Sequence, residues 1–231
     1  MIDNKIIIMV GGCGSRLRPM TYTTPKCLLP ISDGTVLSHI LNNALVHGLA
    51  KSILIGHYFF TDIMGYCHEN KFNPVFIKEA EPMGTCGGIS LVSELLTEDF
   101  FVVNCDTLTN INYENMLETH KANDNIMTIA VYPLTNRVDY AVVYGEDDKV
   151  TKIKEKPSYT CDVSIGLYCF SPKALEFICG KMNIDELINT LLDKKLKVGY
   201  YSMTPENEYW YDIGRSVEDY KKVNSRFKEI V

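Results

Sequence analysis

The strongest constraint on the fold is a short apolar run that ends directly in glycines. Residues Lys5–Val10 form this run, which is rich in isoleucine, and Gly11 and Gly12 follow it at once. A continuous apolar run of this length is typical of a strand that is buried on both of its faces. Similar runs fall at 52–56, 73–78 and 100–104, and segments with helical apolar spacing fall at 36–45 and 85–96. This alternation predicts a parallel sheet with right-handed crossover connections.

The second half of the chain is less regular. We predict strands at 127–132, 140–144, 150–155, 163–170 and 197–203, and helices that begin at 171 and that span 183–192 and 216–227. We find no internal repeat and no linker between the two halves. The sequence therefore predicts a single α/β domain over residues 1–231, with a mixed, mainly parallel central sheet.

Charge and hydropathy exclude several classes of partner. The chain carries 23 Lys and Arg against 29 Asp and Glu, and it has no Lys/Arg-rich run, which excludes nucleic acid as its main partner. Its apolar runs are far shorter than the ~20 residues that a membrane span needs. Its eight cysteines contain no C-x-x-C pair, which is typical of free thiols in a reducing compartment. We therefore expect a cytoplasmic protein that binds neither nucleic acid nor membrane; a homo-oligomer is left open.

A glycine-rich segment follows the first strand. Its glycines let the backbone approach a phosphate or a base closely, and successive N–H groups there make an anion-binding concavity. Leu17 stands where a dinucleotide-binding loop has its third glycine, and no G-K-[ST] sequence closes the segment as a P-loop. Arg16 and Lys26 add the charge that suits a whole triphosphate. The alternative is a tight turn with surface cations.

Six motifs resemble, in order, those of the sugar-1-phosphate nucleotidyltransferases, also called nucleotide-sugar pyrophosphorylases. They are Gly11 to Arg18 with Pro25-Lys26 (G-G-x-G-[TS]-R-L-x-P…P-K), Pro82 to Gly88 (P-L-G-T-A-G), Val103 to Asp106 (V-N-G-D), Glu155 to Pro157 (E-K-P), Gly166 to Tyr168 (G-x-Y) and Trp210 to Gly214 (W-x-D-I-G). The resemblance implies a Rossmann-like three-layer α/β/α fold. It also implies a nucleotide-binding half at 1–110 and a sugar-phosphate-binding half at 111–231.

The reaction that the resemblance implies joins a nucleoside triphosphate (NTP) to a sugar-1-phosphate and releases pyrophosphate. An oxygen of the sugar phosphate attacks the α-phosphorus in line, so positioning and electrostatic stabilisation should dominate catalysis. The implied catalytic residues are Arg16, which can bridge two phosphate oxygens, Lys26, which acts as a point charge, and Asp106. A catalytic thiol is not expected, because the reaction needs no covalent step.

Two aspartates far apart in the sequence are implied to bind Mg²⁺. Asp106 follows the most apolar strand, at the edge where open α/β sheets bind ligands, and Asp212 belongs to the last motif. Magnesium prefers one or two carboxylates together with phosphate oxygens and water. The alternative for Asp106 is a helix cap or turn residue, and Asp212 has only one motif in its support.

The remaining implied contacts divide between the two substrates. The nucleotide is assigned to Gly11, Gly12, Cys13, Gly14, Ser15, Glu79, Gly84 and Thr85, and the sugar phosphate to Glu155, Lys156 and Gly166. A carboxylate such as Glu79 suits the N1–H and N2–H₂ donors of guanine, although a solvated loop residue is an equal interpretation. Without the resemblance, Glu155 and Lys156 would be read as neighbours on an exposed strand.

The expected substrates are GTP and a mannose- or heptose-type sugar-1-phosphate, for a glycan or capsule precursor. Alternatives are a uridylyl- or thymidylyltransferase acting on a hexose- or amino-sugar-1-phosphate, a cytidylyltransferase acting on a phosphorylated non-sugar, and an inactive nucleotide-sugar sensor. Cys27 and Cys105 replace a proline and a glycine of the family's motifs, so they leave the substrate class open.

Overall fold

The computed structural model describes residues 4–227, and its centre is a seven-stranded sheet in the order β12-β8-β11-β6-β1-β4-β5. The strands are β1 (Lys5–Met9), β4 (Lys51–Gly56), β5 (Val75–Lys78), β6 (Phe100–Asn104), β8 (Met127–Arg137), β11 (Ser158–Phe170) and β12 (Val198–Ser202). Of these seven, β11 runs antiparallel to both of its neighbours, and the other four pairs are parallel. The prediction of a mixed, mainly parallel sheet is confirmed.

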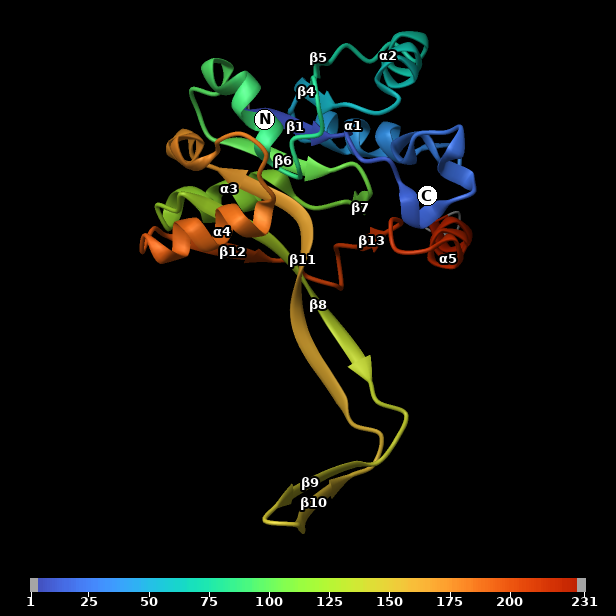
Figure 1. Ribbon diagram of the computed structural model, residues 1–231, viewed down its shortest axis with the longest axis vertical. Coiled ribbons are helices and arrows are strands. Elements are labelled where there is room, and N and C mark those ends of the chain that lie inside the picture. The colour runs from blue at the N-terminus through green and yellow to red at the C-terminus, as the bar shows by residue number, and fades with distance from the viewer. Residues whose placement is uncertain (1–3, 228–231) are drawn as a thin grey trace.

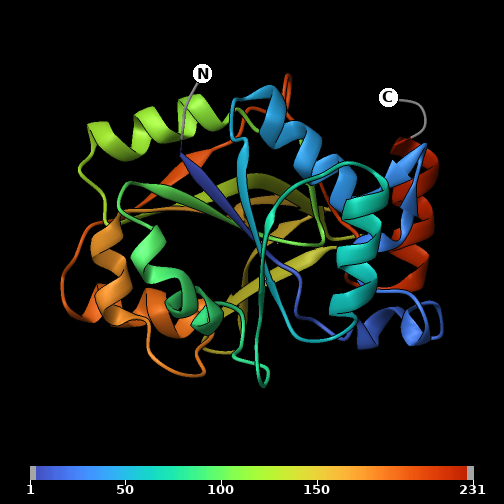
Figure 2. The same ribbon diagram turned by 90° about the horizontal axis from the view of Figure 1, so that it is seen from above.

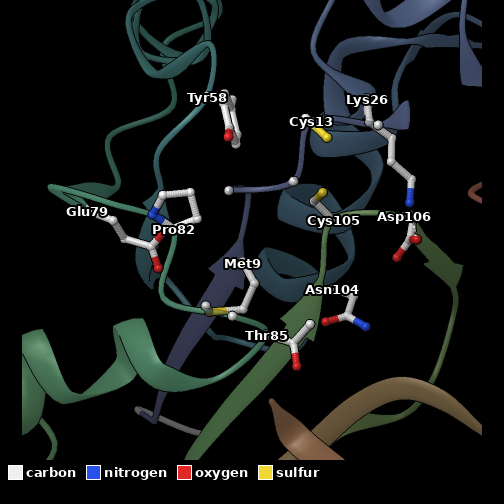
Figure 3. Close-up of a pocket in the computed structure, with 14 residues that line it drawn as sticks. Met9, Cys13, Lys26, Tyr58, Glu79, Pro82, Thr85, Asn104, Cys105 and Asp106 are labelled. Carbon is white, nitrogen blue, oxygen red and sulfur yellow. Dashed lines mark hydrogen bonds and ion pairs between the residues drawn. The ribbon is translucent and has the colours of Figure 1, made fainter. Parts of the chain in front are cut away.

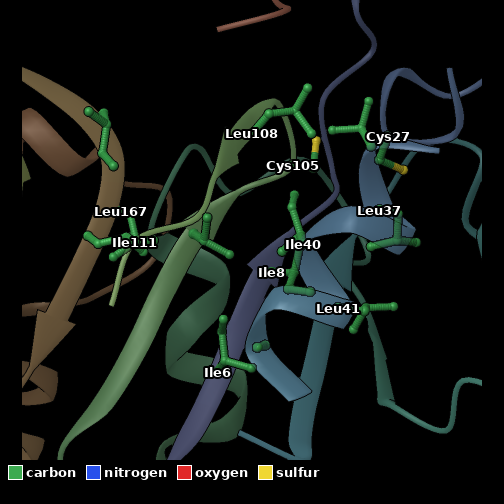
Figure 4. Close-up of a cluster of buried hydrophobic side chains, with 14 of the residues drawn as sticks. Ile6, Ile8, Cys27, Leu37, Ile40, Leu41, Cys105, Leu108, Ile111 and Leu167 are labelled. Carbon is green, nitrogen blue, oxygen red and sulfur yellow. The ribbon is translucent and has the colours of Figure 1, made fainter. Parts of the chain in front are cut away.

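Helices cover both faces of the sheet (Figure 2). One face packs against α1 (Val36–Val46) and α3 (Tyr113–Ala122), and the other packs against the 3-10 helix η4 (Gly87–Leu95) and α4 (Ile184–Asp193). Because side chains alternate along a strand, β1 supplies both cores: Ile6 and Ile8 belong to the first cluster, part of which Figure 4 shows, and Ile7 belongs to the second. The three-layer prediction is therefore confirmed.

Smaller elements surround the carboxyl ends of the strands. They are η1 (Ser15–Leu17), η2 (Met20–Tyr22), η3 (Lys26–Leu28), β2 (Pro30–Ile31), β3 (Gly34–Thr35), α2 (Phe60–Glu69), β7 (Thr107–Thr109), η5 (Pro172–Phe177), β13 (Trp210–Asp212) and α5 (Val217–Phe227). Two of them bring distant segments together, because β13 pairs antiparallel with β7 and places Asp212 opposite Thr107. The last motif of the sequence thus lies beside Asp106.

A long two-stranded ribbon leaves the body of the protein (Figure 1). Beyond Val131 on β8, and before Leu167 on β11, neither strand pairs with the rest of the sheet, although they stay paired with each other out to Arg137 and Ser158. The hairpin of β9 (Val142–Glu146) and β10 (Lys149–Lys154) forms the far end. We call residues 132–164 the ribbon.

Several predicted elements differ in type or length from those observed. The helix predicted at 85–96 is the 3-10 helix η4, whose start is tied down because the N–H groups of Cys86 and Gly87 both donate to the Met182 carbonyl at 3.1 Å. The strands predicted at 127–132 and 163–170 are longer, because they continue into the ribbon. The helices α2 and α3 and the pair β7–β13 were not predicted.

Among residues 4–227, no helix combines the length and the apolar character needed to cross a membrane. All eight cysteines are free thiols.

Candidate active site

A cleft of about 360 Å³ opens at the carboxyl ends of β1, β4 and β6. Its lining comes from the glycine-rich segment, the loops after β4 and β5, and the turn after β6, and consists of Met9, Gly11, Gly12, Cys13, Gly14, Lys26, Tyr58, Glu79, Pro82, Gly84, Thr85, Asn104, Cys105 and Asp106. Figure 3 shows Glu79 on one side of the cleft and the pair Lys26 and Asp106 on the other. The cleft therefore has two chemically different ends.

The glycine-rich segment is fixed by anchors in the core rather than by regular structure. Leu17 is completely buried and Cys27 is 1% exposed, and both belong to the cluster that packs on α1. The Thr21 hydroxyl donates to the Gly14 carbonyl at 2.7 Å and closes the loop. Leu17 follows Arg16 and Cys27 follows Lys26, so each cation is next to a side chain that is fixed in the core.

One end of the cleft is built around an ion pair. The Lys26 ammonium donates to a carboxylate oxygen of Asp106, and both side chains are mostly covered, with exposures of 16% and 24%. The backbone of Gly214 closes over this pair, because a side chain there would collide with both charged groups. The Gly214 N–H in turn donates to the Asp212 carboxylate at 2.7 Å. Three distant segments thus meet at one cluster of charges.

The charges in this cluster perturb one another. Burial alone would lower the pKa of Lys26, but the nearby negative charges and the hydrogen bond that Lys26 donates to Asp106 outweigh it, so the pKa is raised and the ammonium form is favoured. The pKa of Asp212 is also raised, first by burial and further by the Asp106 charge, although the Gly214 N–H and Lys26 oppose this. Two carboxylates with one lysine leave a net negative charge that suits a cation.

The opposite end of the cleft holds a buried carboxyl group. Glu79 is 2% exposed, and its Oε1 has no hydrogen-bond partner. Burial raises the pKa of Glu79, and a backbone hydrogen bond from Met83 and the neighbouring His57 only partly offset this. The absence of a side chain at Gly88 makes room for this carboxyl group, since a Cβ there would overlap Oε1. Because Glu79 lines the cleft, its carboxyl group lies at the end where a ligand that donates hydrogen bonds would bind.

The structure brings together most of the predicted nucleotide residues. All of them except Ser15 line the cleft, as do Lys26 and Asp106. Ser15 and Arg16 lie on η1 beside the cleft and are exposed. The equal alternative for Glu79, a solvated loop residue, is wrong, because the side chain is buried.

The predicted sugar-phosphate residues are not gathered in one place. Gly166 lies on β11 next to Asn104, which lines the cleft, since a Cβ on Gly166 would lie 2.6 Å from the Asn104 amide nitrogen. Glu155 and Lys156 lie instead between β10 and β11, near the far end of the ribbon, and both are exposed. Within one chain, they do not line the cleft.

The sequence analysis missed Tyr58 as a lining residue. Tyr58 lies two residues after the end of β4 and packs edge-on against His57, with ring centroids 4.9 Å apart. Its place just after a buried strand was the available signal, because the ends of parallel strands meet at one edge of the sheet.

The two unusual cysteines lie beneath the ion pair. Cys27 and Cys105 are both buried, at 1% and 7% exposure. A hydrogen bond with the Cys105 thiol and burial raise the pKa of the Cys27 thiol well above its ordinary value. A thiol in this state is a poor nucleophile. Cys27 packs in the core beside α1.

Comparison with known families gives one match that covers nearly the whole chain. The model of the family described as "Nucleotidyl transferase" matches residues 5–229. A mannose-1-phosphate guanylyltransferase catalytic subunit beta from Xenopus tropicalis is 30% identical over 231 residues, which cover 91% of this chain and 61% of the relative. The chain thus spans about three fifths of the length of the curated relatives it matches.

Solved structures agree in fold. HddC from Yersinia pseudotuberculosis, in complex with GMP-PN, is 25% identical with a TM-score of 0.76, covering 97% of this chain and 100% of that one. An inositol-1-phosphate CTP transferase from T. maritima is 15% identical with a TM-score of 0.72, covering 99% and 97%, and shows likeness of fold alone.

Replacing Glu79 with glutamine should stabilise the ligand-free protein at high pH. Because burial raises the pKa of Glu79 in the folded state, the folded state binds its proton more tightly than the unfolded state does. Stability is therefore lost as the pH rises from the ordinary value of 4.5 through the raised pKa, and an uncharged amide at this position would not suffer the loss. We expect a higher Tm for Glu79→Gln than for the wild type at pH 8, and near-equality at pH 4.

The matched control is Glu81→Gln, since Glu81 is exposed on the same loop. Its Tm should follow the wild type at both pH values. A Glu79→Gln variant that lost stability at pH 8 would contradict the interpretation of a buried, uncompensated carboxylate.

Proposed function

The chain belongs to the nucleotidyl transferase family, and from this premise we propose that it condenses GTP with a sugar-1-phosphate of the mannose or heptose type. The products are a GDP-sugar, a precursor for glycan or capsule synthesis, and pyrophosphate. The proposal is supported by a relative named for guanylyl transfer to mannose-1-phosphate, and by the GMP-PN complex of HddC. The observation that carries the choice of base is the carboxylate of Glu79.

Guanine fits the buried end of the cleft better than the other bases do. The N1–H and N2–H₂ groups of guanine present adjacent donors on one edge, and a carboxylate accepts from both. Uracil and thymine present one donor between two acceptors, so one of their carbonyls would face the carboxylate. Because Oε1 of Glu79 is buried and has no partner, binding a base with two donors would relieve a cost that the free protein carries.

The opposite end of the cleft suits the phosphates. Residues Gly11 to Gly14 of the glycine-rich segment line the cleft and can offer backbone N–H groups to an anion, and Lys26 and Arg16 add positive charge beside them. We assign Arg16 to bridging phosphate oxygens and Lys26 to stabilising negative charge near the α-phosphorus, where the sugar-phosphate oxygen attacks in line. The chain thus positions two anionic reactants and stabilises their charge, with no covalent intermediate.

Asp106 and Asp212 fit a magnesium ion. The two carboxylates interact electrostatically beside Lys26, and together they carry more negative charge than the single lysine compensates. Magnesium accepts one or two carboxylates and takes its other ligands from phosphate oxygens and water. When bound, the ion would neutralise phosphate charge. In this proposal Asp106 and Asp212 hold it.

All the residues that line the cleft lie between positions 9 and 106, which supports residues 1–110 as the nucleotide-binding half. We place the sugar phosphate beside Asn104 and Gly166, at the root of the ribbon. We place the reaction in the cytoplasm, where a reducing environment keeps thiols free, in keeping with the eight free cysteines.

The reaction is tested by measuring pyrophosphate release with Mg²⁺. GTP, dTTP, UTP, CTP and ATP are crossed with a panel of sugar-1-phosphates that includes mannose and heptose forms, and with phosphocholine. We expect release with GTP and a manno-configured sugar-1-phosphate. Pyrophosphate release confined to UTP or dTTP would contradict the base assignment. No release by the folded protein with any substrate pair would contradict the reaction.

Replacing Glu79 with glutamine should remove the preference for guanine over hypoxanthine. ITP keeps the N1–H of GTP but lacks the N2 amine, so the wild type should favour GTP by one hydrogen bond to a charged acceptor, roughly 10-fold or more in kcat/KM. The amide of the Glu79→Gln variant offers one acceptor and one donor, so kcat/KM should fall for GTP more than for ITP. Steady-state kinetics with both nucleotides measure the ratio, and Glu81→Gln is the control. An unchanged GTP/ITP ratio would contradict the contact.

Arg16→Ala should abolish most turnover without changing stability. Its guanidinium is exposed on η1, so the folded protein loses little when it is removed, whereas the transition state loses a charged contact worth about 10²–10³-fold in kcat. Arg18→Ala is the matched control, because Arg18 is an exposed cation two residues away that stacks on Tyr22 at 5.3 Å. Equal losses in both variants would show that general positive charge, rather than a positioned contact, accounts for the effect.

A further inference from the structure

The ribbon is a large part of the fold that does not line the cleft. Its hairpin β9–β10 has an apolar face, on which Val143, Val150 and Ile153 are 56%, 63% and 62% exposed. The register aligns them, because Val143 pairs with Ile153, and Val150 pairs with Gly145, two residues along β9. Three exposed apolar side chains gathered on one face of a projection are typical of a contact surface.

A ribbon of this kind is poorly stabilised by itself. An isolated two-stranded hairpin is at best marginally stable in water, and it needs a third strand or a packed face. In the part of the chain that the structure describes, β9 and β10 pair with each other alone. Both outer edges of the ribbon are open as well, and open edges pair readily with other strands. The ribbon therefore requires a partner surface.

The charge of the ribbon favours a second copy of this chain as that partner. The ribbon carries six acidic and five basic side chains: Asp139, Glu146, Asp147, Asp148, Glu155 and Asp162, against Arg137, Lys149, Lys152, Lys154 and Lys156. A surface that carries no excess of positive charge does not suit nucleic acid or an anionic membrane. A surface with both signs in nearly equal number can complement itself across a twofold axis, where one patch meets the same patch.

The position of the ribbon's root gives this pairing a consequence for the site. Gly166 lies at the root beside Asn104 of the cleft, whereas Glu155 and Lys156 lie near the far end. The paired stretch between them, from Tyr132–Val163 to Arg137–Ser158, is about 20 Å long. Two such ribbons have equal lengths. If they lie side by side, antiparallel and fully overlapped, the far end of each lies at the root of the other, next to its cleft.

We propose that two copies of the chain exchange ribbons about a twofold axis, and that each ribbon carries Glu155 and Lys156 to the sugar-phosphate side of the other copy's cleft. The apolar face of β9–β10 is buried in this arrangement. The Lys156 ammonium supplies a charge for the sugar phosphate, and the Glu155 carboxylate accepts from sugar hydroxyls. The pairing stands on the ribbon alone, whereas the delivery of these two side chains rests on the proposed function.

The pairing is tested by the mass of the folded protein in solution. We expect twice the chain mass of 26.2 kDa by light scattering, and a monomer for the double variant Val143→Asp/Ile153→Asp. Val46→Asp is the matched control, since Val46 is 79% exposed on α1 and should leave the dimer intact. Circular dichroism checks that each variant is folded. A monomeric wild type, or a double variant that remains dimeric, would overturn the exchange.

The delivery of Glu155 and Lys156 is tested by complementation. One chain carries Lys26→Ala, which damages the cleft and leaves the ribbon intact; the other carries Glu155→Ala/Lys156→Ala. Each variant alone should lose most of its pyrophosphate release. Co-expressed with different tags and purified as a heterodimer, the pair has one intact cleft served by an intact ribbon, so it should recover about half of the wild-type turnover per dimer.

The outcomes separate the two proposals. No recovery in the heterodimer, with an active wild type, would show that each ribbon serves its own cleft or none, and would overturn the delivery. A wild type that releases no pyrophosphate with any substrate pair would contradict the proposed function. In that case the light-scattering result would still decide the pairing.

Discussion

The ion pair between Lys26 and Asp106 is the contact on which the geometry of the cleft depends. It joins the segment after β1 to the turn after β6, and Gly214 closes over it from the chain's last motif. Each of these segments is short and irregular, so none would hold its position alone. The core fixes them from below, through Leu17 and Cys27 on one side and the β7–β13 ladder on the other. A charge cluster on a rigid base costs little reorganisation when anionic ligands bind.

The charged groups at the two ends of the cleft are compensated to different degrees. Lys26 is buried but paired, so its charge is compensated before any ligand binds. Glu79 is buried with one oxygen lacking a partner, so its charge is compensated only in part. A paired cation can exchange its partner for phosphate, whereas an unpaired acceptor discriminates strongly, because a ligand without matching donors leaves it unsatisfied. The structure thus separates the holding of phosphate from the selection of a base.

Three central strands of the sheet were predictable because they are buried on both faces and therefore read as unbroken apolar runs. The strands β1, β4 and β6 follow from that pattern alone, and the cleft follows from where they end, whereas β5 is a partly exposed edge strand. The helix α3 was not predicted, because its ten residues are mostly polar. Its start also depends on the Asn112 side chain, which accepts from the Asn115 N–H at 3.0 Å. The pair β7–β13 was not predicted, because strands of three residues are too short to show a periodic apolar pattern in the sequence, and about a hundred residues separate them. The resemblance assigned Asp212 to the site, and this ladder is the physical reason it lies there.

The residues assigned to the sugar phosphate show where a single sequence stops being informative. Gly166 and Asn104 meet because neighbouring strands of one sheet carry them, whereas Glu155 and Lys156 follow β10, which is not a strand of that sheet. A motif fixes residue types, but its position in space depends on whether the intervening strands pair with the body or with another molecule. If the ribbon pairs with a second copy, nucleotide binding is a property of one chain and sugar-phosphate binding is a property of two. Dissociation would then separate the affinity for nucleotide, which the cleft alone provides, from turnover, which needs both substrates held at one phosphorus.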